Sequence, residues 1–314
     1  MRLQQNNTSI IIPVRNEAEN VDILLAQIKQ TLANNTAEYE VIFVNDGSTD
    51  GTQSALEEIQ KNNPELIKII EFRKNFGKAD AYQAGFELCS GDLIFTMDGD
   101  LQDDPNDMPK FLEQIDNGYD VVVGWKFERY DSKSKILQSR LFNFILRHLV
   151  KIPLHDFDNG YRCMKREVLN HLHLYEGMYR YIPVFADAKG FKITEVKVNH
   201  RPRKFGKSKY GFSRLGKGFF DLIALGFISI YFKKPLHFFG GIGGALFSIG
   251  FSAAFYLSYL KIFLGEPIGN RPLLLFSALL MIIGIQLIFF GLIGEMIANI
   301  SKKEKNYSIK KILK

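Results

Sequence analysis

The stretch Leu93-Ile94-Phe95-Thr96-Met97 runs directly into Asp98-Gly99-Asp100-Leu101-Gln102-Asp103-Asp104-Pro105. A short apolar run that stops at carboxylates predicts a buried strand ending at a polar site. In an extended backbone, Asp98, Asp100 and Gln102 would point to one side, because alternate residues share a face. Two carboxylates and an amide oxygen suit a hard divalent cation that also binds phosphates, such as Mg2+ or Mn2+. The alternative interpretation is an ordinary acidic turn between a strand and a helix.

Polar residues also follow the other predicted strands. Residues 9–14, 40–46 and 66–72 are apolar runs with polar residues at or just beyond their ends, namely Arg15 and Glu17, Asp46, and Arg73. Apolar residues recur at helical spacing in between, which predicts alternating strands and helices and hence a mostly parallel sheet. Ligands of such sheets bind outside the carboxyl ends of the strands. The absence of a G-x-G-x-x-G and of a Walker A pattern disfavours a dinucleotide fold and a P-loop.

The composition excludes several classes of protein. The 314 residues allow one large domain or two small ones. The net charge of +6 is concentrated in residues 301–314, with six Lys and one Glu, and in residues 201–217, with seven basic residues and no acidic one. The remainder is acidic, unlike the broad basic face of a nucleic-acid-binding protein. Cys89 and Cys163 form no C-x-x-C pair, which argues against a disulfide framework or a zinc site and fits a reducing compartment.

Two apolar stretches are long enough to cross a membrane. Residues 236–260 and residues 272–294 contain no Lys, Arg, Asp or Glu, and a membrane helix needs about 20 such residues. Lys233 and Lys234 precede the first stretch and the Lys-rich tail follows the second, so the positive-inside rule places both ends in the cytoplasm. Gly240 and Gly244 are candidates for a helix-packing face, although Gly is simply common in membrane helices.

Four motifs occur in order: Ile11-Ile12-Pro13-Val14-Arg15-Asn16-Glu17, Val44-Asn45-Asp46-Gly47-Ser48-Thr49-Asp50-Gly51-Thr52, Asn75-Phe76-Gly77-Lys78, and the acidic stretch at 98–105. Together they resemble the family 2 glycosyltransferases, whose GT-A fold is a Rossmann-like α/β architecture. Residues 156–162, a basic loop at 201–211 and the two spans narrow the resemblance to the polyprenyl-phosphate glycosyltransferases. That group includes dolichyl-phosphate mannose synthases and bacterial bactoprenol glucosyltransferases. The resemblance covers nearly the whole chain.

The resemblance implies a nucleotide-sugar donor, a divalent cation and a polyprenyl-phosphate acceptor. It assigns the donor to Pro13, Arg15, Glu17, Asp46, Lys78 and Asp98. It assigns Mg2+ or Mn2+ to Asp98, Asp100 and Gln102. It assigns the diphosphate and the acceptor phosphate to the basic loop, at Arg201, Arg203, Ser208 and Lys209. The alternative for this loop is a juxtamembrane patch that touches anionic lipid, and the two uses are compatible.

The reaction that the resemblance implies is displacement at the anomeric carbon with inversion, in which the metal stabilises the leaving diphosphate. A phosphate monoester has a second pKa of about 6, so this acceptor needs a base less than a sugar hydroxyl would. The hypothesis is that Asp156 or Asp158 is catalytic, by orienting the acceptor or by taking its residual proton. Asp156 and Asp158 are two residues apart, so their side chains would point the same way if this segment were a strand. The alternative is that one of them merely pairs with Arg162. The expected donors are of the UDP-glucose or GDP-mannose type.

These inferences divide the chain into a cytoplasmic GT-A domain at 1–212, juxtamembrane helices at 213–234, a two-helix transmembrane domain at 235–300 and a basic cytoplasmic tail at 301–314. The segment 213–234 is expected to lie in the membrane interface, with burial in the soluble domain as the alternative. The expected location is the inner membrane, with the catalytic domain and both termini in the cytoplasm. A separate flippase and a downstream glycosyltransferase are expected partners, nucleic acid is not, and homo-oligomerisation stays open.

Two rival functions fit the sequence less well. A processive polysaccharide synthase usually carries a Q-x-x-R-W segment and more spans, and Trp125, the only Trp, lies in no such segment. A non-catalytic membrane scaffold predicts loss of the metal carboxylates, whereas Asp98 and Asp100 are both present. The sequence therefore favours a metal-dependent enzyme.

Overall fold

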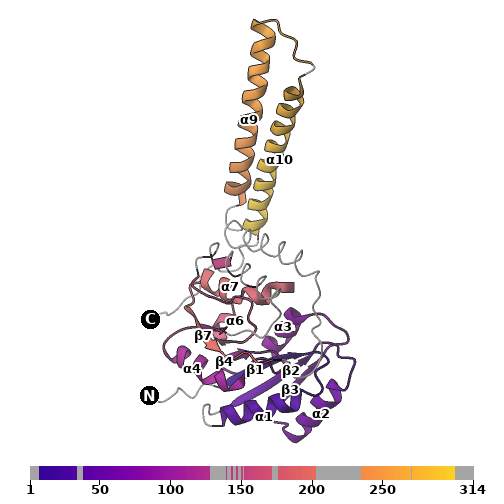
Figure 1. Cartoon of the computed structure of the whole chain (residues 1–314), viewed down its shortest axis with the longest axis vertical. Helices are drawn as coiled ribbons and strands as arrows, with labels where there is room; N and C mark the ends of the chain where they lie inside the picture. Colours follow the sequence, from indigo (N-terminus) through magenta and orange to yellow (C-terminus); the bar gives the residue numbers. More distant parts are fainter. Residues whose placement is uncertain are drawn as a thin grey trace. The chain divides into compact units, whose positions relative to one another are not determined.

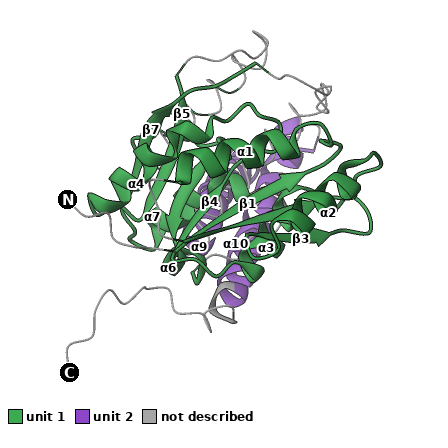
Figure 2. Cartoon of the chain, turned by 90° about the horizontal axis from the view of Figure 1, so that it is seen from below, with its two compact units in different colours: residues 1–222, 307–314 green, residues 223–306 purple. Residues whose placement is uncertain are grey.

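In the computed structural model, the described residues are 7–33, 38–127, 139, 143, 146, 147, 150, 152–171, 176–202, 235–269 and 271–300. The chain forms two compact units, which Figure 2 distinguishes by colour: residues 1–222 with 307–314, and residues 223–306. The predicted interfacial segment 213–234 and the basic tail 301–314 lie outside the described residues. Those two parts of the predicted organisation therefore stay predictions.

The first unit is built on one seven-stranded sheet with the order β3-β2-β1-β4-β6-β5-β7 (Figure 1). Its strands are β1 (Thr8–Val14), β2 (Tyr39–Asn45), β3 (Ile67–Glu71), β4 (Leu93–Thr96), β5 (Val121–Lys126), β6 (Arg162–Lys165) and β7 (Ile193–Val198). Only β6 is antiparallel to its neighbours, β4 and β5, while the other pairs are parallel. The predicted mostly parallel α/β sheet is confirmed, whereas the sequence does not predict β6 and β7.

Helices cover both faces of this sheet (Figure 1). On one face lie α1 (Val21–Leu32), α2 (Thr52–Asn62) and α4 (Met108–Asp116), and on the other lie α3 (Lys78–Leu88) and α7 (Ile182–Ala188). Three short helices complete the described part of the unit: η1 (Pro105–Asp107), α6 (Arg166–Leu169) and η2 (Glu176–Tyr181). Alternation along β1 explains the layers, because Ile10 and Ile12 join the core beneath α1, whereas Ile11 contacts Gly85 of α3.

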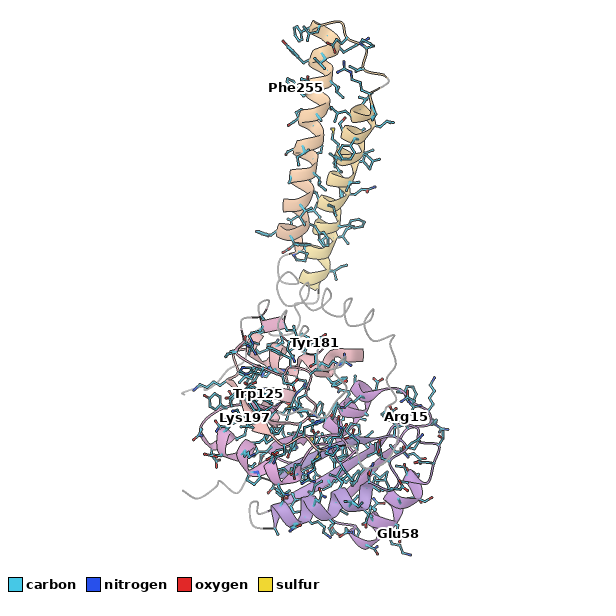
Figure 3. The ribbon with its side chains drawn as sticks, in the orientation of Figure 1. Arg15, Glu58, Trp125, Tyr181, Lys197 and Phe255 are labelled. Carbon is cyan, nitrogen blue, oxygen red and sulfur yellow. The ribbon has the colours of Figure 1, made fainter. Side chains whose placement is uncertain are left out.

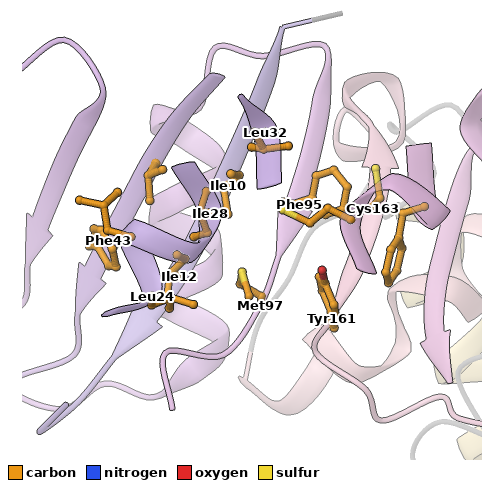
Figure 4. Close-up of a cluster of buried hydrophobic side chains, with 14 of the residues drawn as sticks. Ile10, Ile12, Leu24, Ile28, Leu32, Phe43, Phe95, Met97, Tyr161 and Cys163 are labelled. Atoms are coloured by element: carbon orange, nitrogen blue, oxygen red, sulfur yellow. The ribbon is translucent and has the colours of Figure 1, made fainter. Parts of the chain in front are cut away.

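The main hydrophobic core lies between the sheet and α1. Figure 4 places Leu24, Ile28 and Leu32 of α1 against Ile10 and Ile12 of β1, and all five side chains are fully buried. The four-residue spacing puts the α1 side chains on one face of the helix. Burial of each contributes about 1.5–3 kcal/mol. This core therefore fixes the central strands whose ends carry the polar residues.

The single reversed strand decides which loops meet. Strands β1, β2 and β4 are parallel and end at the same edge of the sheet, here called the site edge. Because β6 is antiparallel to β4, its first residue, Arg162, lies beside Thr96, the last residue of β4. Residues that precede β6 therefore reach the same edge as residues that follow β4.

The second unit contains two long helices, α9 (Pro235–Phe263) and α10 (Pro272–Ile300). Both are long and apolar enough to be candidate membrane spans, in agreement with the two apolar stretches of the sequence. Phe255 of α9 is 68% exposed (Figure 3). Such an exposed aromatic side chain fits a helix surrounded by lipid.

Glycines bring α9 and α10 into close, antiparallel contact. Gly243 packs against the Gly284 carbonyl, and Gly250 packs against the Ser277 carbonyl. The candidate pair Gly240 and Gly244 does not form this contact: within the described residues, a Cβ at Gly244 would meet nothing within 4 Å. The alternative, that Gly is simply common in membrane helices, therefore fits this pair, and a spacing rule does not single out Gly243 because several glycines lie close together.

Candidate active site

The acidic loop, residues 98–104, follows β4 at the site edge. It is not extended, because a turn follows Asp98 and Leu101 has a positive φ of 61°. The prediction that an extended backbone points Asp98, Asp100 and Gln102 to one side is therefore wrong. The left-handed backbone at Leu101 turns the chain toward η1 instead. The candidate metal ligands thus belong to a tight turn rather than to the continuation of a strand.

The segment after β7 fastens the acidic loop. The backbone N–H of Arg201 donates to the Gln102 carbonyl at 2.9 Å. The guanidinium of Arg201 lies 2.5 Å from Asp104 Oδ2 and donates to Gln27 Oε1 at 3.0 Å. Arg201, which the sequence assigns to phosphate, is thus engaged with the acidic loop and α1. The other predicted phosphate ligands, Arg203, Ser208 and Lys209, lie outside the described residues.

Lys78 reaches Asp98 across the site edge. Helix α3 begins at Lys78, directly after Gly77 with its φ of 106°, and the ammonium forms an ion pair with Asp98 Oδ1. The two side chains are 22% and 32% exposed, so a ligand can reach both. Burial alone would lower the pKa of Lys78, but the Asp98 carboxylate raises it well above its ordinary value. Lys78 is therefore a permanent cation beside the acidic loop.

Asp46 supports the connection that carries Lys78. Its carboxylate accepts the backbone N–H of Phe76 at 2.7 Å and that of Gly77 at 3.2 Å, and the Asn75 amide also donates to it. These bonds satisfy donors that precede α3 and would otherwise lack partners. Asp46, which the sequence assigns to the donor, thus orders the loop between β3 and α3.

The end of β1 supplies the other predicted donor residues. Pro13 is partly exposed, and Arg15 is exposed at the surface (Figure 3). Glu17 is buried, where it accepts the Asn20 side-chain amide at 2.5 Å and donates its backbone N–H to Thr52 Oγ1 at 2.9 Å. Pro13 and Arg15 therefore present accessible atoms at the site edge, while Glu17 lies behind them.

The loop before β6 brings Asp156 and Asp158 to the site edge. Asp156 is 2% exposed. The Asp158 side chain is 29% exposed and lies 3.0 Å from Arg180 Nε. Neither aspartate belongs to a strand, so the expectation that a strand aims both the same way is wrong. Their positions instead follow from the irregular loop that leads into the reversed strand.

Arg162 anchors this loop from inside. It is 1% exposed and donates to the backbone carbonyls of Tyr179, Phe157 and Arg180, the last two at 2.9 and 3.3 Å. Burial lowers the pKa of Arg162, and the nearby carboxylates oppose that shift. The Arg162 guanidinium thus connects η2 to residues 156–160, here called the aspartate loop. Asp158 of this loop forms its ion pair with Arg180 instead.

Gly160 lies where the loop before β6 meets the Lys78–Asp98 pair. A Cβ at this position would lie 3.1 Å from both Asp98 Oδ1 and Lys78 Nζ, and 3.2 Å from the Tyr82 hydroxyl. Thr96 Oγ1 donates to the Gly160 carbonyl at 2.7 Å, which ties the loop to the end of β4. The absence of a side chain at Gly160 therefore lets the aspartate loop approach the Lys78–Asp98 pair.

This arrangement of acidic loop, lysine and reversed strand can be compared with known proteins. Residues 9–172 match the family model described as Glycosyl transferase family 2. The chain belongs to this family. The family predicted from the four motifs is thereby confirmed.

Two curated relatives of this glycosyltransferase match nearly the whole chain. A dodecaprenyl-phosphate galacturonate synthase of Rhizobium johnstonii is 31% identical, over 99% of this chain and 94% of the relative. An undecaprenyl-phosphate 4-deoxy-4-formamido-L-arabinose transferase of Yersinia pestis is 33% identical, over 93% of this chain and 88% of the relative. Matches of this extent reach beyond the family model into the second unit.

Among solved structures, a glucosyl-3-phosphoglycerate synthase of Mycobacterium tuberculosis has a similar fold. It was solved with Mn2+, UDP and glucosyl-3-phosphoglycerate, and it aligns over 71% of this chain and 79% of its own with a TM-score of 0.56. At 18% identity, the likeness concerns the fold alone. The predicted GT-A-like fold class is confirmed.

The metal ligands predicted for this glycosyltransferase are oxygen donors around one turn. No group of three or more His, Cys, Asp and Glu side chains that could hold a metal occurs among the described residues. Mg2+ needs no such cage, because it takes one or two carboxylates together with waters and substrate phosphates. Asp98 and the largely buried Asp100, whose Oδ1 accepts the Gln102 N–H at 3.2 Å, supply two carboxylates. The donor set therefore fits a metal held jointly with a diphosphate.

A second lysine lies among these acids. Lys126 Nζ is 2.9 Å from Asp103 Oδ1, and the two side chains are 15% and 0% exposed. Burial would lower the pKa of Lys126, but Asp103 and, beyond it, Asp98 raise it. Lys78 and Lys126 thus balance part of the charge of the acidic loop before any ligand binds.

Three residues beside the candidate site of this glycosyltransferase escape the sequence prediction: Tyr82, Tyr179 and Arg180. The Tyr179 ring lies 5.7 Å from the Tyr82 ring, and its centroid lies 5.5 Å from Lys78 Nζ. Tyr82 follows Lys78 by four residues on α3, so helical spacing could have identified it. Tyr179 and Arg180 lie in the short helix η2, which carries no periodic signal.

Proposed function

We propose that this chain transfers a sugar from a nucleotide-sugar donor to polyprenyl phosphate, giving a polyprenyl-phosphate sugar. One observation carries this proposal: two relatives that match more than nine-tenths of the chain are both named for polyprenyl-phosphate acceptors, yet for different sugars. The acceptor class is what they share, whereas the sugar varies. The reaction is therefore the inverting transfer expected from the sequence, and the donor sugar is the quantity to measure.

The donor side of the proposed site comprises the ends of β1, β2 and β4. Pro13, Arg15 and Glu17 lie where the nucleoside would bind, with Asp46 ordering the adjoining loop. The Lys78 ammonium lies next to Asp98, where it can bind a diphosphate oxygen as well as the carboxylate. Cationic groups preorganised around the leaving diphosphate stabilise the charge that develops there.

Mg2+ or Mn2+ is the proposed cofactor, held by Asp98, Asp100 and Gln102 together with the diphosphate. A divalent ion at this place would neutralise charge on the departing phosphate oxygens. The oxygen-only donor set supports a hard cation over a thiolate-preferring one. Arg201 would hold the acidic loop in its turn, and Lys78 would supply a positive charge that is present before any ligand binds.

Asp156 and Asp158 are the proposed catalytic residues on the acceptor side. Asp158 is the more accessible of the two, whereas Asp156 lies within the loop. The dianionic form of the acceptor phosphate needs no base, so a carboxylate here would take the residual proton of the monoanionic form or orient the acceptor through the cation with which it pairs. We expect Asp156→Ala or Asp158→Ala to lower the turnover number at least about tenfold. A smaller loss in both variants would contradict the assignment.

The second unit is proposed to anchor the enzyme in the inner membrane. Helices α9 and α10 are the candidate spans, and the lysines at 233, 234 and in the tail support a cytoplasmic location of the catalytic unit and both termini. The basic loop with Arg203, Ser208 and Lys209 would then serve the phosphates near the membrane surface. Two helices enclose no conduit, so a separate flippase and a downstream transferase are proposed partners.

The test is product formation by the purified full chain with undecaprenyl phosphate and Mg2+ or Mn2+. Radiolabelled UDP-glucose, GDP-mannose, UDP-N-acetylhexosamines, UDP-galacturonate and UDP-4-deoxy-4-formamido-L-arabinose would be screened as donors. We expect an organic-extractable labelled lipid from one donor, and its loss in Asp100→Ala. Label in a water-soluble polymer, or no turnover although nucleotide binds, would contradict the proposal.

A further inference from the structure

Two ion pairs lie near one tyrosine side chain at the site edge. In the first pair, Lys78 contacts Asp98, and Lys78 Nζ lies 5.5 Å from the Tyr179 ring centroid. In the second pair, Arg180 lies 3.0 Å from Asp158, and Arg180 Nε also donates to the Tyr179 hydroxyl at 3.3 Å. The first pair adjoins the acidic loop, where the diphosphate is proposed to bind. The second pair adjoins the aspartate loop, where the acceptor is proposed to react.

Three further described cations near the proposed active site have other partners. Arg162 is fully buried and donates to backbone carbonyls. Arg201 is engaged with Asp104 and Gln27. Lys126 pairs with the buried Asp103. Within the described residues, Arg180 is therefore the cation placed beside the proposed catalytic aspartates, with a side chain that is still 15% exposed.

We propose that Arg180 binds the phosphate of the acceptor, and that the phosphate takes the place of Asp158 as its partner. This inference rests on the proposed function. A phosphomonoester carries about −1.5 to −2 charges at neutral pH, and the planar guanidinium can donate two parallel N–H bonds to it. The exchange replaces one anion by another, so Arg180 stays paired in both states. The Asp158 carboxylate then lies beside the bound phosphate, where it can take the residual proton of the monoanionic form.

The local electrostatics fit such an exchange. Burial would lower the pKa of Arg180, but the Asp158 carboxylate raises it, so the guanidinium stays charged with either partner. The Tyr179 side chain contacts both cations, since its ring centroid lies 5.5 Å from Lys78 Nζ and its hydroxyl accepts from Arg180 Nε at 3.3 Å. The diphosphate and the acceptor phosphate would thus each meet their own cation, with Tyr179 beside both.

The test measures both substrates of the full chain in detergent. We expect Arg180→Met to raise the KM for undecaprenyl phosphate at least about tenfold, the effect of losing a charged hydrogen-bond donor, while the KM of the sugar donor changes less than about threefold. Arg180→Lys should recover part of the loss, because it keeps the charge but not the fork. It also provides the readout if Arg180→Met does not fold. An unchanged lipid KM in both variants would overturn the proposal.

Arg166→Met is the matched control. Arg166 lies at the opposite edge of the sheet, where its Nε donates to the Gly91 carbonyl at 2.7 Å. Its removal should lower the melting temperature without changing the KM for undecaprenyl phosphate. An equal rise of the lipid KM in Arg166→Met would show that loss of any partly buried arginine disturbs the site, and would overturn the specific role of Arg180.

A double variant separates phosphate binding from charge balance. If Arg180 only neutralised Asp158, then Arg180→Met with Asp158→Asn would regain the wild-type lipid KM, which would overturn the proposal. We expect the raised KM to persist instead. Equilibrium binding of farnesyl phosphate and farnesol gives a readout without turnover: the wild type should prefer the phosphate, and Arg180→Met should lose most of that preference. A wild type that neither prefers the phosphate nor forms labelled lipid would overturn the proposed function as well, whereas an active wild type with an unaffected Arg180→Met overturns the Arg180 assignment alone.

Discussion

The two halves of the site are built in different ways. In the parallel half, formed by β1 to β4, the candidate site residues follow strands and meet because parallel strands end together. In the reversed half, formed by β6, residues 156–160 and η2, the candidate site residues precede a strand or lie in a short helix. One antiparallel strand, β6, is therefore enough to bring a second set of loops to the site edge.

The largest expected effect lies in the parallel half. Asp98→Asn removes both a proposed metal ligand and the partner of Lys78. We expect kcat/KM to fall by about 10²–10³, the usual cost of removing one electrostatic contact to the transition state. Asp80→Asn, which alters an exposed carboxylate on the same helix as Lys78, is the control and should change kcat/KM less than about twofold. An equal fall of kcat/KM in the two variants would contradict the proposed role of Asp98 as a metal ligand and partner of Lys78.

A substitution at the edge of the sheet opposite the site edge should change the stability of the fold instead of the activity. Glu40 lies at the start of β2 and accepts bonds from Ser9 at 2.5 Å and Lys68 at 2.6 Å. Burial alone would raise the pKa of Glu40, but bonds from Lys68, Ser9 and Ser90 lower it from 4.5 to about 2. A depressed carboxyl pKa stabilises the fold above the unfolded value and loses that contribution as the pH falls toward 2.

Glu40→Gln should therefore reduce the free energy of unfolding at neutral pH by about 3 kcal/mol. The difference from the wild type should shrink between about pH 4.5 and pH 2. Denaturant unfolding of the two proteins across this range measures it, and donor KM serves as the control that should stay constant. A difference independent of pH would show that packing rather than the carboxylate charge is responsible.

The sequence predicted the parallel half well and the reversed half poorly, for a physical reason. Apolar runs that end at Asp46 and Asp98 predict a ligand site, because the carboxyl ends of parallel strands lie at the same edge of a sheet. Asp156 and Asp158 were found through the family resemblance, but their geometry was not, because the reversal of β6 is a tertiary pairing. Arg180 lies in a short helix without a periodic signal.

The acidic loop itself shows a similar limit. Its carboxylates were predicted correctly as a group at the end of β4. The positive φ of Leu101 was not, because a left-handed backbone at a leucine has no local signature and is stabilised by contacts with distant residues. One such distant contact is Arg201, nearly a hundred residues further on, which the resemblance assigned to phosphate.

Gly160 lies where the two halves meet, so its substitution should disturb both. Gly160→Ala places a Cβ 3.1 Å from Asp98 Oδ1 and from Lys78 Nζ, which forces both to shift by a few tenths of an ångström. We expect kcat/KM to fall about tenfold, since small displacements at a reacting site are costly. Gly51→Ala, whose Cβ would meet only Ala18 at 3.9 Å, is the control. A full-activity Gly160→Ala enzyme would mean that the halves tolerate a wider separation.

The smallest expected effect concerns the fastening of the acidic loop. Arg201→Met removes the contacts to Asp104 and Gln27. We expect the Mn2+ concentration for half-maximal activity to rise about three- to tenfold, with loss of one partly exposed ion pair contributing about 1 kcal/mol. Lys110→Met, which removes the largely exposed partner of Asp107, is the control. If Arg201→Met raised the lipid KM instead, Arg201 would be a phosphate ligand, as the resemblance implies.

In the proposed division of the site, the parallel half binds the sugar donor and the reversed half receives the lipid phosphate. The most direct measurement is a crossed pair of KM values, for the nucleotide sugar and for undecaprenyl phosphate, in Lys78→Met and Arg180→Met. We expect Lys78→Met to raise mainly the donor KM and Arg180→Met to raise mainly the lipid KM. If both variants raised the same KM, the two ion pairs beside Tyr179 would serve one substrate, and the division of the site would be wrong.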